Sequence, residues 1–451
     1  MNRREMIGVT ASGLGALFHG MAEASENTVT GSKQPDVLAW ERKVPLRWDT
    51  DIVVVGGGMA GVGAAAAAAR TGARVLLVER FAVTGGMLTV GGVANFCGDM
   101  EGQGEVFDEI LEDLHKWKAL GGPSRDSVFH YETLAFVLQE LLLRRDVKLL
   151  LHTRFVDLRV TNGNITELLL YGTSGLEAVR TRQVIDCTGE GDVARAAGFS
   201  VMKGRNQDGL QLPMSMMYFV RHVQEEGHGP LLPEGWLTPV ETKEDLPMTS
   251  IWPDGPGANA IKVKVPAFDS TDTESLTAAE IAARRRIREV MHYHQSVEKR
   301  PWILDHCSPI IGIREGVRIL GDYVLTVEDL RAGKRFEDGI ARGCYELDGH
   351  KPDDEKRTYI LPEEERTVPP YQIPLRSLIA KEGNNLLMAG RCFSADQLAL
   401  SSARVSTTAC MMGQAAGIAA ALAVQKGTDL RNVDPKEVQE EIRKRGAVLD
   451  L

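Results

Sequence analysis

The stretch Asp51-Ile-Val-Val-Val-Gly-Gly-Gly-Met-Ala-Gly61 decides the fold expected of this chain. A short apolar run leads into the glycines, and the alanine-rich segment 64–69 follows directly. A second apolar run, Arg74-Val-Leu-Leu-Val-Glu79, ends in an acidic residue. This order predicts a strand, a glycine turn, a helix and a second strand, the unit that binds the pyrophosphate of a dinucleotide.

Each glycine of this turn has its own expected task. Gly56 permits the tight turn, Gly58 lets the backbone approach the phosphates, and Gly61 lets helix and strand pack closely. The helix N-terminus presents free N–H groups to the anion. Glu79 is expected to accept hydrogen bonds from the hydroxyls of the adenosine ribose.

Three later segments favour a flavin dinucleotide over a nicotinamide dinucleotide. A second glycine pair, Gly85-Gly86-Met87, follows the acidic residue. The apolar run before Asp186-Cys-Thr-Gly-Glu-Gly-Asp192 is preceded by two strand-like runs, which the turn signal Asn162-Gly163-Asn164 joins. Near the C-terminus, Asn385–Arg391 predicts a strand. Ser406–Gln425 predicts a small-residue helix that aims its N-terminus at the flavin pyrimidine ring.

With these segments the chain resembles the FAD-dependent oxidoreductases of the glutathione-reductase superfamily, from about residue 51 to residue 427. The likeness also rests on Gly312–Thr326, Tyr371–Leu378 and Ala389–Cys392. It implies an α/β fold with a Rossmann-like FAD-binding domain of glutathione-reductase type and an inserted substrate or cap lobe. It also implies bound FAD and redox chemistry on a small organic molecule. The residues expected to contact the cofactor are Gly56, Gly58, Met59, Ala60, Gly61, Glu79, Arg80, Gly86, Met87, Val156, Thr188, Gly189, Asp192, Gly390 and Arg391.

Composition and pattern divide the chain into five parts. The FAD-binding domain is predicted over residues 51–205 and 371–430. The Pro-rich stretch with several tryptophans from about residue 206 starts the substrate or cap lobe, predicted over 206–370. Residues 25–50 read as a polar linker, and residues 431–451 as a C-terminal helix or tail.

The first 24 residues resemble an export signal. Arg3 and Arg4 precede a mildly apolar stretch, 6–21, and Ala22-Glu23-Ala24 supplies a cleavage site. The arginine pair with low hydrophobicity favours the twin-arginine route and a periplasmic or secreted protein. Glu5 departs from that pattern, and the alternative is a disordered tail with a chance arginine pair.

Charge and cysteine usage exclude several classes of partner and site. The 62 acidic and 52 basic residues give a net charge of −10, which argues against nucleic acid. No run approaches the ~18 apolar residues of a membrane span. Six cysteines without a CxxC spacing exclude a redox dithiol and give no zinc or iron–sulfur pattern, so no metal is expected. Cys187, Cys392 and Cys410 are expected to be small buried hydrophobes, and disulfide pairing stays open.

Four side chains are candidates for the catalytic chemistry. Arg314 would bind a substrate carboxylate or the flavin edge, or else pair with Glu315. Arg391 is expected beside the isoalloxazine. Related sequences often carry a histidine after Gly-Arg-Cys, where this chain has Asp396, which is either a base next to Arg391 or a helix N-cap. His306 is either an acid/base at the lobe junction or a structural histidine.

The sequence therefore predicts an exported FAD-dependent dehydrogenase or oxidase that transfers a hydride from a small organic substrate to flavin N5. Electrons would then pass to oxygen, a quinone or a small redox partner. One alternative is a reductase of an activated double bond, which resembles fumarate reductase and needs an Arg–His cluster in the insertion that the sequence does not reveal. A flavin electron carrier without its own substrate is the other alternative, and the large aromatic insertion argues against it.

Overall fold

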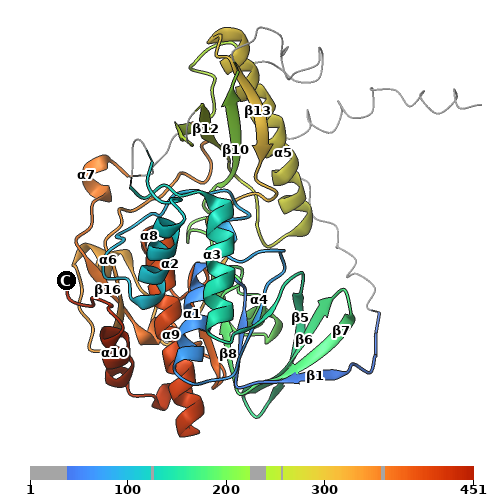
Figure 1. The fold of residues 1–451 in the computed structure, drawn as a ribbon, viewed down its shortest axis with the longest axis vertical. Helices are drawn as coiled ribbons and strands as arrows, with labels where there is room; N and C mark the ends of the chain where they lie inside the picture. The colour runs from blue at the N-terminus through green and yellow to red at the C-terminus, as the bar shows by residue number, and fades with distance from the viewer. Residues whose placement is uncertain (1–37, 123–125, 224–239, 255–256, 357–360) are drawn as a thin grey trace, which may run out of the picture. The chain divides into compact units, whose positions relative to one another are not determined.

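The computed structural model describes residues 38–122, 126–223, 240–254, 257–356 and 361–451 (Figure 1). The predicted export signal and the first half of the predicted linker, residues 25–37, lie outside the described residues. Residues 44–451 form one compact unit, which contains all the elements that follow.

A parallel sheet forms the centre of the part of this unit that contains the predicted dinucleotide-binding segments, which is called the cofactor part below. Its strands are short and almost entirely apolar, as expected of a parallel sheet covered on both faces. The predicted strand–turn–helix–strand unit is confirmed, with α1 spanning Met59–Arg70. In sheet order the strands are β17 (Leu386–Met388), β8 (Gln183–Asp186), β2 (Ile52–Val55), β3 (Val75–Val78) and β4 (Lys148–Leu150).

Helices α1 and α9 (Ser406–Lys426) pack against each other through small residues. A Cβ on Gly413 would lie 2.0 Å from the Ala60 carbonyl oxygen, and one on Gly417 would lie 2.2 Å from the Ala64 oxygen. Among the described residues, α9 alone is long and apolar enough to cross a membrane. However, 94% of that apolar window is buried in the protein, as in a core helix. The small-residue composition of both helices therefore serves their close approach.

Helices α2 (Glu105–Lys116) and α3 (Tyr131–Arg144) pack together beside α1 and α9 (Figure 1). Apolar residues recur along both at three- and four-residue spacing, as in helices that bury one face. The cofactor part thus has helices of very different composition, because α1 and α9 are buried within it and α2 and α3 each keep a polar face.

A second sheet contains the predicted meander of β5 (Arg154–Thr161), β6 (Asn164–Gly172) and β7 (Gly175–Arg180). Asn162 and Gly163 have φ of 51° and 76° in the turn between β5 and β6, which confirms the predicted hairpin signal. Strand β1 (Leu46–Asp49) pairs with β7. The predicted linker therefore ends before residue 50, since its last residues add an edge strand to this sheet.

The insertion forms a separate antiparallel sheet, in the order β11 (Thr249–Pro253), β12 (Ala258–Val265), β10 (Met214–His222) and β13 (Trp302–Cys307). Helix α5 (Thr273–His292) covers one face. The side chains that pack in a core cluster with α5 alternate along β10 and β12: Met214, Met216, Tyr218, Val220, Ile261, Val263 and Val265. The residues between them, which include Ser215, Met217 and Lys262, belong to the other face.

The last part of the range predicted for the lobe, residues 206–370, packs with the parallel sheet. Leu325, Leu330 and Ile340 belong to the hydrophobic cluster of the parallel sheet, not to that of the lobe. The apolar run 310–313 before Arg314 forms no strand, and Gly312 makes only an isolated bridge to Ser215. The remaining elements are α4 (Asp192–Ala196), β9 (Val201–Lys203), β14 (Val317–Ile319), α6 (Val327–Arg331), β15 (Gly339–Gly343), α7 (Glu363–Arg366), β16 (Tyr371–Pro374), α8 (Gln397–Ala403) and the predicted C-terminal helix α10 (Pro435–Lys444).

Candidate functional site

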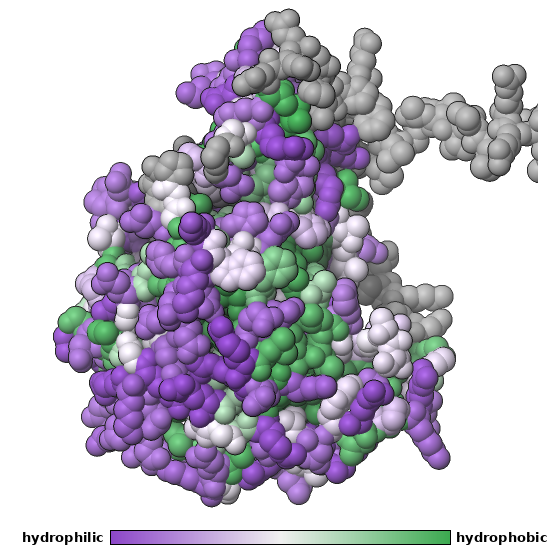
Figure 2. Space-filling view, in the orientation of Figure 1, coloured by the Kyte–Doolittle hydropathy of each residue, from purple (hydrophilic) through white to green (hydrophobic). Residues whose placement is uncertain are grey.

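A single cavity of about 1100 Å³ connects the cofactor part with the lobe. Its volume exceeds the ~300–1,000 Å³ typical of a small-molecule pocket, so it has room for more than one ligand. All the residues expected to contact the cofactor line this cavity except Gly61. Val156 of β5 lines the cavity and is 47% exposed. Figure 2 shows hydrophobic side chains gathered between α3 and the meander of β5 to β7.

The glycine turn fits a pyrophosphate. Gly58 precedes α1 without any side-chain cap, and a Cβ on Gly58 would meet nothing within 4 Å. The backbone at the helix N-terminus therefore faces open space, as an anion requires. A Cβ on Gly61 would lie 1.8 Å from the Gly56 carbonyl oxygen, which explains why Gly61 packs inside the turn instead of lining the cavity.

Glu79 is fixed at the end of β3, where its side chain is 5% exposed. One carboxylate oxygen accepts the Gly57 N–H at 2.6 Å and the other accepts the Phe81 N–H at 2.9 Å. Each oxygen keeps a further lone pair, so the carboxylate can still accept a hydroxyl from a ligand. This geometry suits the expected contact with a ribose.

The loop after β8 is held by the fully buried Asp186. Its carboxylate accepts hydrogen bonds from the Thr188 N–H and hydroxyl and from two N–H groups of α4. Burial raises the pKa of Asp186 to about 6, against the opposing effect of these bonds. Gly189 next in the loop has φ +75° and a Cβ there would lie 2.5 Å from the Arg391 guanidinium, so glycine is required.

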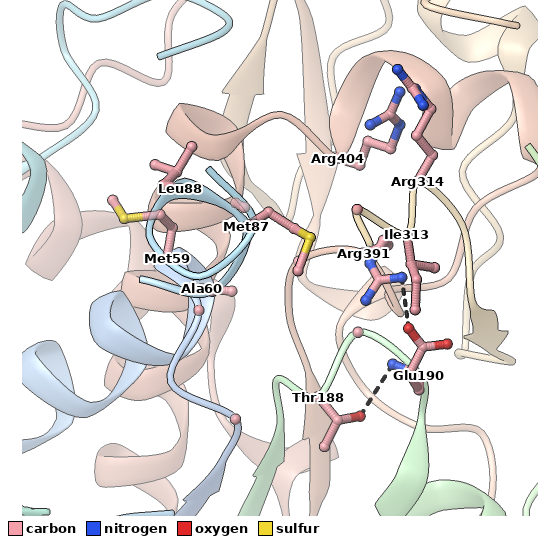
Figure 3. A pocket seen from close by; sticks show the side chains of 18 of the residues that line it. Met59, Ala60, Met87, Leu88, Thr188, Glu190, Ile313, Arg314, Arg391 and Arg404 are labelled. Atoms are coloured by element: carbon pink, nitrogen blue, oxygen red, sulfur yellow. Dashed lines mark hydrogen bonds and ion pairs between the residues drawn. The ribbon is translucent and has the colours of Figure 1, made fainter. Parts of the chain in front are cut away.

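Arg391 lines the cavity, and its charge partner is Glu190, whereas the sequence predicted Asp396 next to it. Arg391 Nη1 lies 2.7 Å from a carboxylate oxygen of Glu190 (Figure 3). The other oxygen of Glu190 accepts the Ser270 hydroxyl at 3.2 Å. Burial raises the pKa of Glu190, although the charge of Arg391 opposes it. This pair connects the loop after β8 with the C-terminal strand end.

Asp396, the predicted base beside Arg391, lies outside the cavity lining. Its two oxygens accept the N–H groups of Ala399 and Val327, each at 2.7 Å. It is therefore the N-cap of α8, the alternative that the sequence left open. Burial raises the pKa of Asp396 because it disfavours the charged form.

His306 also lies outside the cavity lining. Its Nε2 lies 2.6 Å from the Tyr131 hydroxyl, and its Nδ1 lies 2.9 Å from an Asp305 oxygen. The ring stacks on Phe219 with centroids 4.4 Å apart. These contacts favour the structural alternative for this histidine.

Arg314 lines the cavity and is not paired with Glu315, which binds Arg318 instead. Its Nη1 donates to the Pro213 carbonyl oxygen at 2.9 Å and to the Ser215 hydroxyl. Burial lowers the pKa of Arg314 to about 10, so the guanidinium remains charged at neutral pH. Figure 3 shows Arg404 close beside it.

Several cavity residues near Arg314 escaped the sequence analysis. Asp348 lies 2.6 Å from Arg404 Nη2 and 3.1 Å from His350 Nε2. Lys262, on the cavity face of β12, lines the same space. Two sequence signals existed: lysines alternate with apolar residues in Ala258–Val265, and the pair Arg404-Val405 belongs to the segments that carry the family resemblance. Asp348 stands in no recognisable motif.

No group of three or more histidines, cysteines or acidic residues in the described part of the chain could hold a metal ion. All six cysteines are free thiols, and Cys187, Cys392 and Cys410 are buried as predicted.

Comparisons with known proteins identify the family of this chain. Residues 51–442 match the family described as FAD dependent oxidoreductase. No match was found among curated proteins.

Three solved structures can be compared with this chain. A geranylgeranyl bacteriochlorophyll reductase-like protein from Thermoplasma acidophilum is 13% identical, with 88% of this chain and 83% of that chain covered and a TM-score of 0.46. The flavin-dependent brominase Bmp2 is 12% identical over 88% and 83%, with a TM-score of 0.43. CabE, an aromatic hydroxylase from angucycline biosynthesis, is 17% identical over 88% and 66%, with a TM-score of 0.42. Likenesses this low carry no argument about activity.

The family match covers most of the chain and includes the glycine turn, the acidic strand end and the loop after β8 that line the cavity. The chain therefore belongs to the FAD-dependent oxidoreductases, and it is an enzyme whose cofactor is FAD.

Proposed function

We propose that this enzyme oxidises a small organic molecule bound between the FAD-binding part and the lobe. The observation that carries the proposal is the shared cavity, which the glycine turn lines at one place and β10 and β12 line at another. Bound FAD would supply the electron acceptor, with flavin N5 taking a hydride. The chain's own residues would hold the substrate and exclude water from it.

The lobe has the composition of a substrate-binding cover. Its sheet packs α5 on one face, and its other face presents Ser215, Met217 and Lys262 to the cavity. Trp252 of β11 lines the cavity as well. A parallel sheet with a returning meander, together with this inserted lobe, supports the glutathione-reductase-type arrangement that we propose for the whole.

A second candidate is the opposite direction of transfer, from reduced cofactor to an activated double bond. That candidate requires an Arg–His cluster near the flavin. Arg314, Arg404 and His350 line one cavity and provide such a cluster, although Arg404 and His350 come from outside the lobe. Mixing photoreduced enzyme anaerobically with fumarate-like acceptors, or with oxygen, distinguishes the two directions by which of them reoxidises the flavin.

We also propose that the enzyme is exported by the twin-arginine route and passes electrons to oxygen, a quinone or a small redox partner. The support is in the sequence alone, from Arg3, Arg4 and the Ala22-Glu23-Ala24 site. Export of a folded protein would suit a chain that binds its cofactor before translocation.

The central experiment is a search for bleaching of the bound flavin. The purified holoenzyme would be mixed anaerobically with sugars, amines, hydroxy acids and their neutral analogues, and flavin absorbance followed in time. We expect at least one class to bleach the flavin. Bleaching by none of them, with reoxidation by fumarate-like acceptors, would favour the second candidate.

A further inference from the structure

We propose that Lys262, Arg314 and Arg404 form a binding site for a carboxylate of the substrate, so that the enzyme acts on small organic acids. This inference rests on the proposed function and names its substrate class. The three cations come from β12, from the segment before β14 and from the segment between α8 and α9, and all three line the same cavity.

The charges of this cluster do not balance. At neutral pH Lys262, Arg314 and Arg404 are cations. Asp348 is the carboxylate whose negative charge acts on both Arg314 and Lys262. Burial would raise the pKa of Asp348, but the bond to His350 and the charge of Arg404 outweigh it and lower that pKa far below its usual range. His350 itself is neutral, because burial and then the charge of Arg314 lower its pKa to about 3.

The other ionisable groups beside the cluster add no negative charge. Burial and then the charge of Asp348 raise the pKa of Cys97, and burial raises that of Tyr345, so both stay protonated. An excess of about two positive charges therefore lines this part of the cavity. Partly buried charges without compensation are costly, and a bound anion removes that cost.

The cations also keep donors that the protein does not use. Asp348 is already bound by Arg404 and His350. Within the described residues, no hydrogen bond or ion pair reaches the ammonium of Lys262, and only Nη1 of Arg314 has acceptors. Guanidinium and ammonium donors bind a planar carboxylate through strong charge-assisted hydrogen bonds.

Lys264, on the same strand, is a lysine whose ammonium has a hydrogen-bond partner within the protein. Lys264 lies two residues from Lys262, is fully buried, and donates to the Asp354 carbonyl oxygen. It does not line the cavity. Lys264 therefore offers a matched control for the loss of one lysine charge on this face of β12.

The test is ligand binding to the oxidised holoenzyme, followed by perturbation of the flavin absorbance and by calorimetry. Malonate is the probe, malonamide its uncharged counterpart and sulfate an inorganic anion. We expect malonate to bind and malonamide not to bind. Lys262→Met should weaken malonate at least tenfold, as loss of a charged hydrogen bond predicts, whereas Lys262→Arg and Lys264→Met should not.

Malonate affinity should also fall as the pH rises through about 8. Burial and then the charge of Arg314 lower the pKa of Lys262 to about 8, so the ammonium is present below that pH and lost above it. The charged groups that face it are Arg314, Arg404 and Asp348. Of these, Arg314 and Asp348 keep their charges across this interval, because their pKa values lie well above and well below it.

Equal binding of malonate and malonamide, or parental affinity in Lys262→Met, would overturn the proposal. Sulfate binding as tight as malonate binding would overturn its carboxylate specificity. If Lys262→Met changes only the FAD content or the midpoint potential, the cations serve the cofactor and the proposal also fails. Because no turnover is needed, malonate binding without bleaching by any acid would uphold this site and refute only the proposed oxidation.

Discussion

Replacing Gly58 by valine tests the cofactor site at the point where the chain approaches the ligand most closely. Gly58 has φ −66° and ψ −179°, a conformation that valine readily adopts, and a Cβ there meets nothing within 4 Å. The protein itself therefore tolerates the substitution. The added methyl groups would occupy the space that the first N–H groups of α1 face, and there they would exclude a phosphate.

The loss can be sized from the bonds removed. If two hydrogen bonds to the charged pyrophosphate are lost, at ~1.5–3 kcal/mol each, FAD binding weakens by ~3–6 kcal/mol. That corresponds to a factor of ~10²–10⁴ in the dissociation constant. The assay is FAD content after purification, followed by titration of the apoprotein with FAD and by thermal unfolding of the apoprotein. We expect a colourless Gly58→Val protein that melts close to the parent apoprotein.

Gly61→Val is the matched control, because a Cβ there would lie 1.8 Å from the Gly56 carbonyl oxygen. It should destabilise the fold itself and lower the melting temperature, whereas Gly58→Val should not. A yellow Gly58→Val protein with parental FAD affinity would refute the assignment of this turn to the pyrophosphate.

Three further predictions follow from single contacts. Glu79→Ala should weaken FAD by ~1.5–3 kcal/mol in an apoprotein titration, through lost bonds to a charged group, and unchanged affinity would mean that the ribose is held elsewhere. Asp396→Ala should lower the free energy of unfolding by ~1 kcal/mol in urea denaturation and leave flavin reduction by a substrate unchanged, because its carboxylate caps α8 outside the cavity. A tenfold slower reduction at full FAD content would restore Asp396 as a base. Arg3→Lys combined with Arg4→Lys should leave the chain in the cytoplasm with its signal uncleaved on immunoblots of cell fractions, and normal periplasmic processing would exclude the twin-arginine route.

The cofactor site was predictable from the sequence because its signals are local. The apolar run of β2, the glycine turn and the first residues of α1 follow one another in the chain, and each has its own conformational preference. The close approach at Gly61 is local as well, because it is to Gly56, five residues away. The division of β10 residues between the two faces of its sheet likewise follows from the period of a strand.

Tertiary structure alone decided which charged side chains meet in the cavity. Lys262, Arg314 and Arg404 are each more than fifty residues apart in the chain, and no spacing rule links them. Asp396 had two local interpretations of equal merit, and the choice depended on Val327, which lies 69 residues away and donates to the same carboxylate. Such contacts arise when segments distant in the chain pack together, and their relative placement depends on many apolar contacts at once, whereas a turn or a strand depends on its own few residues.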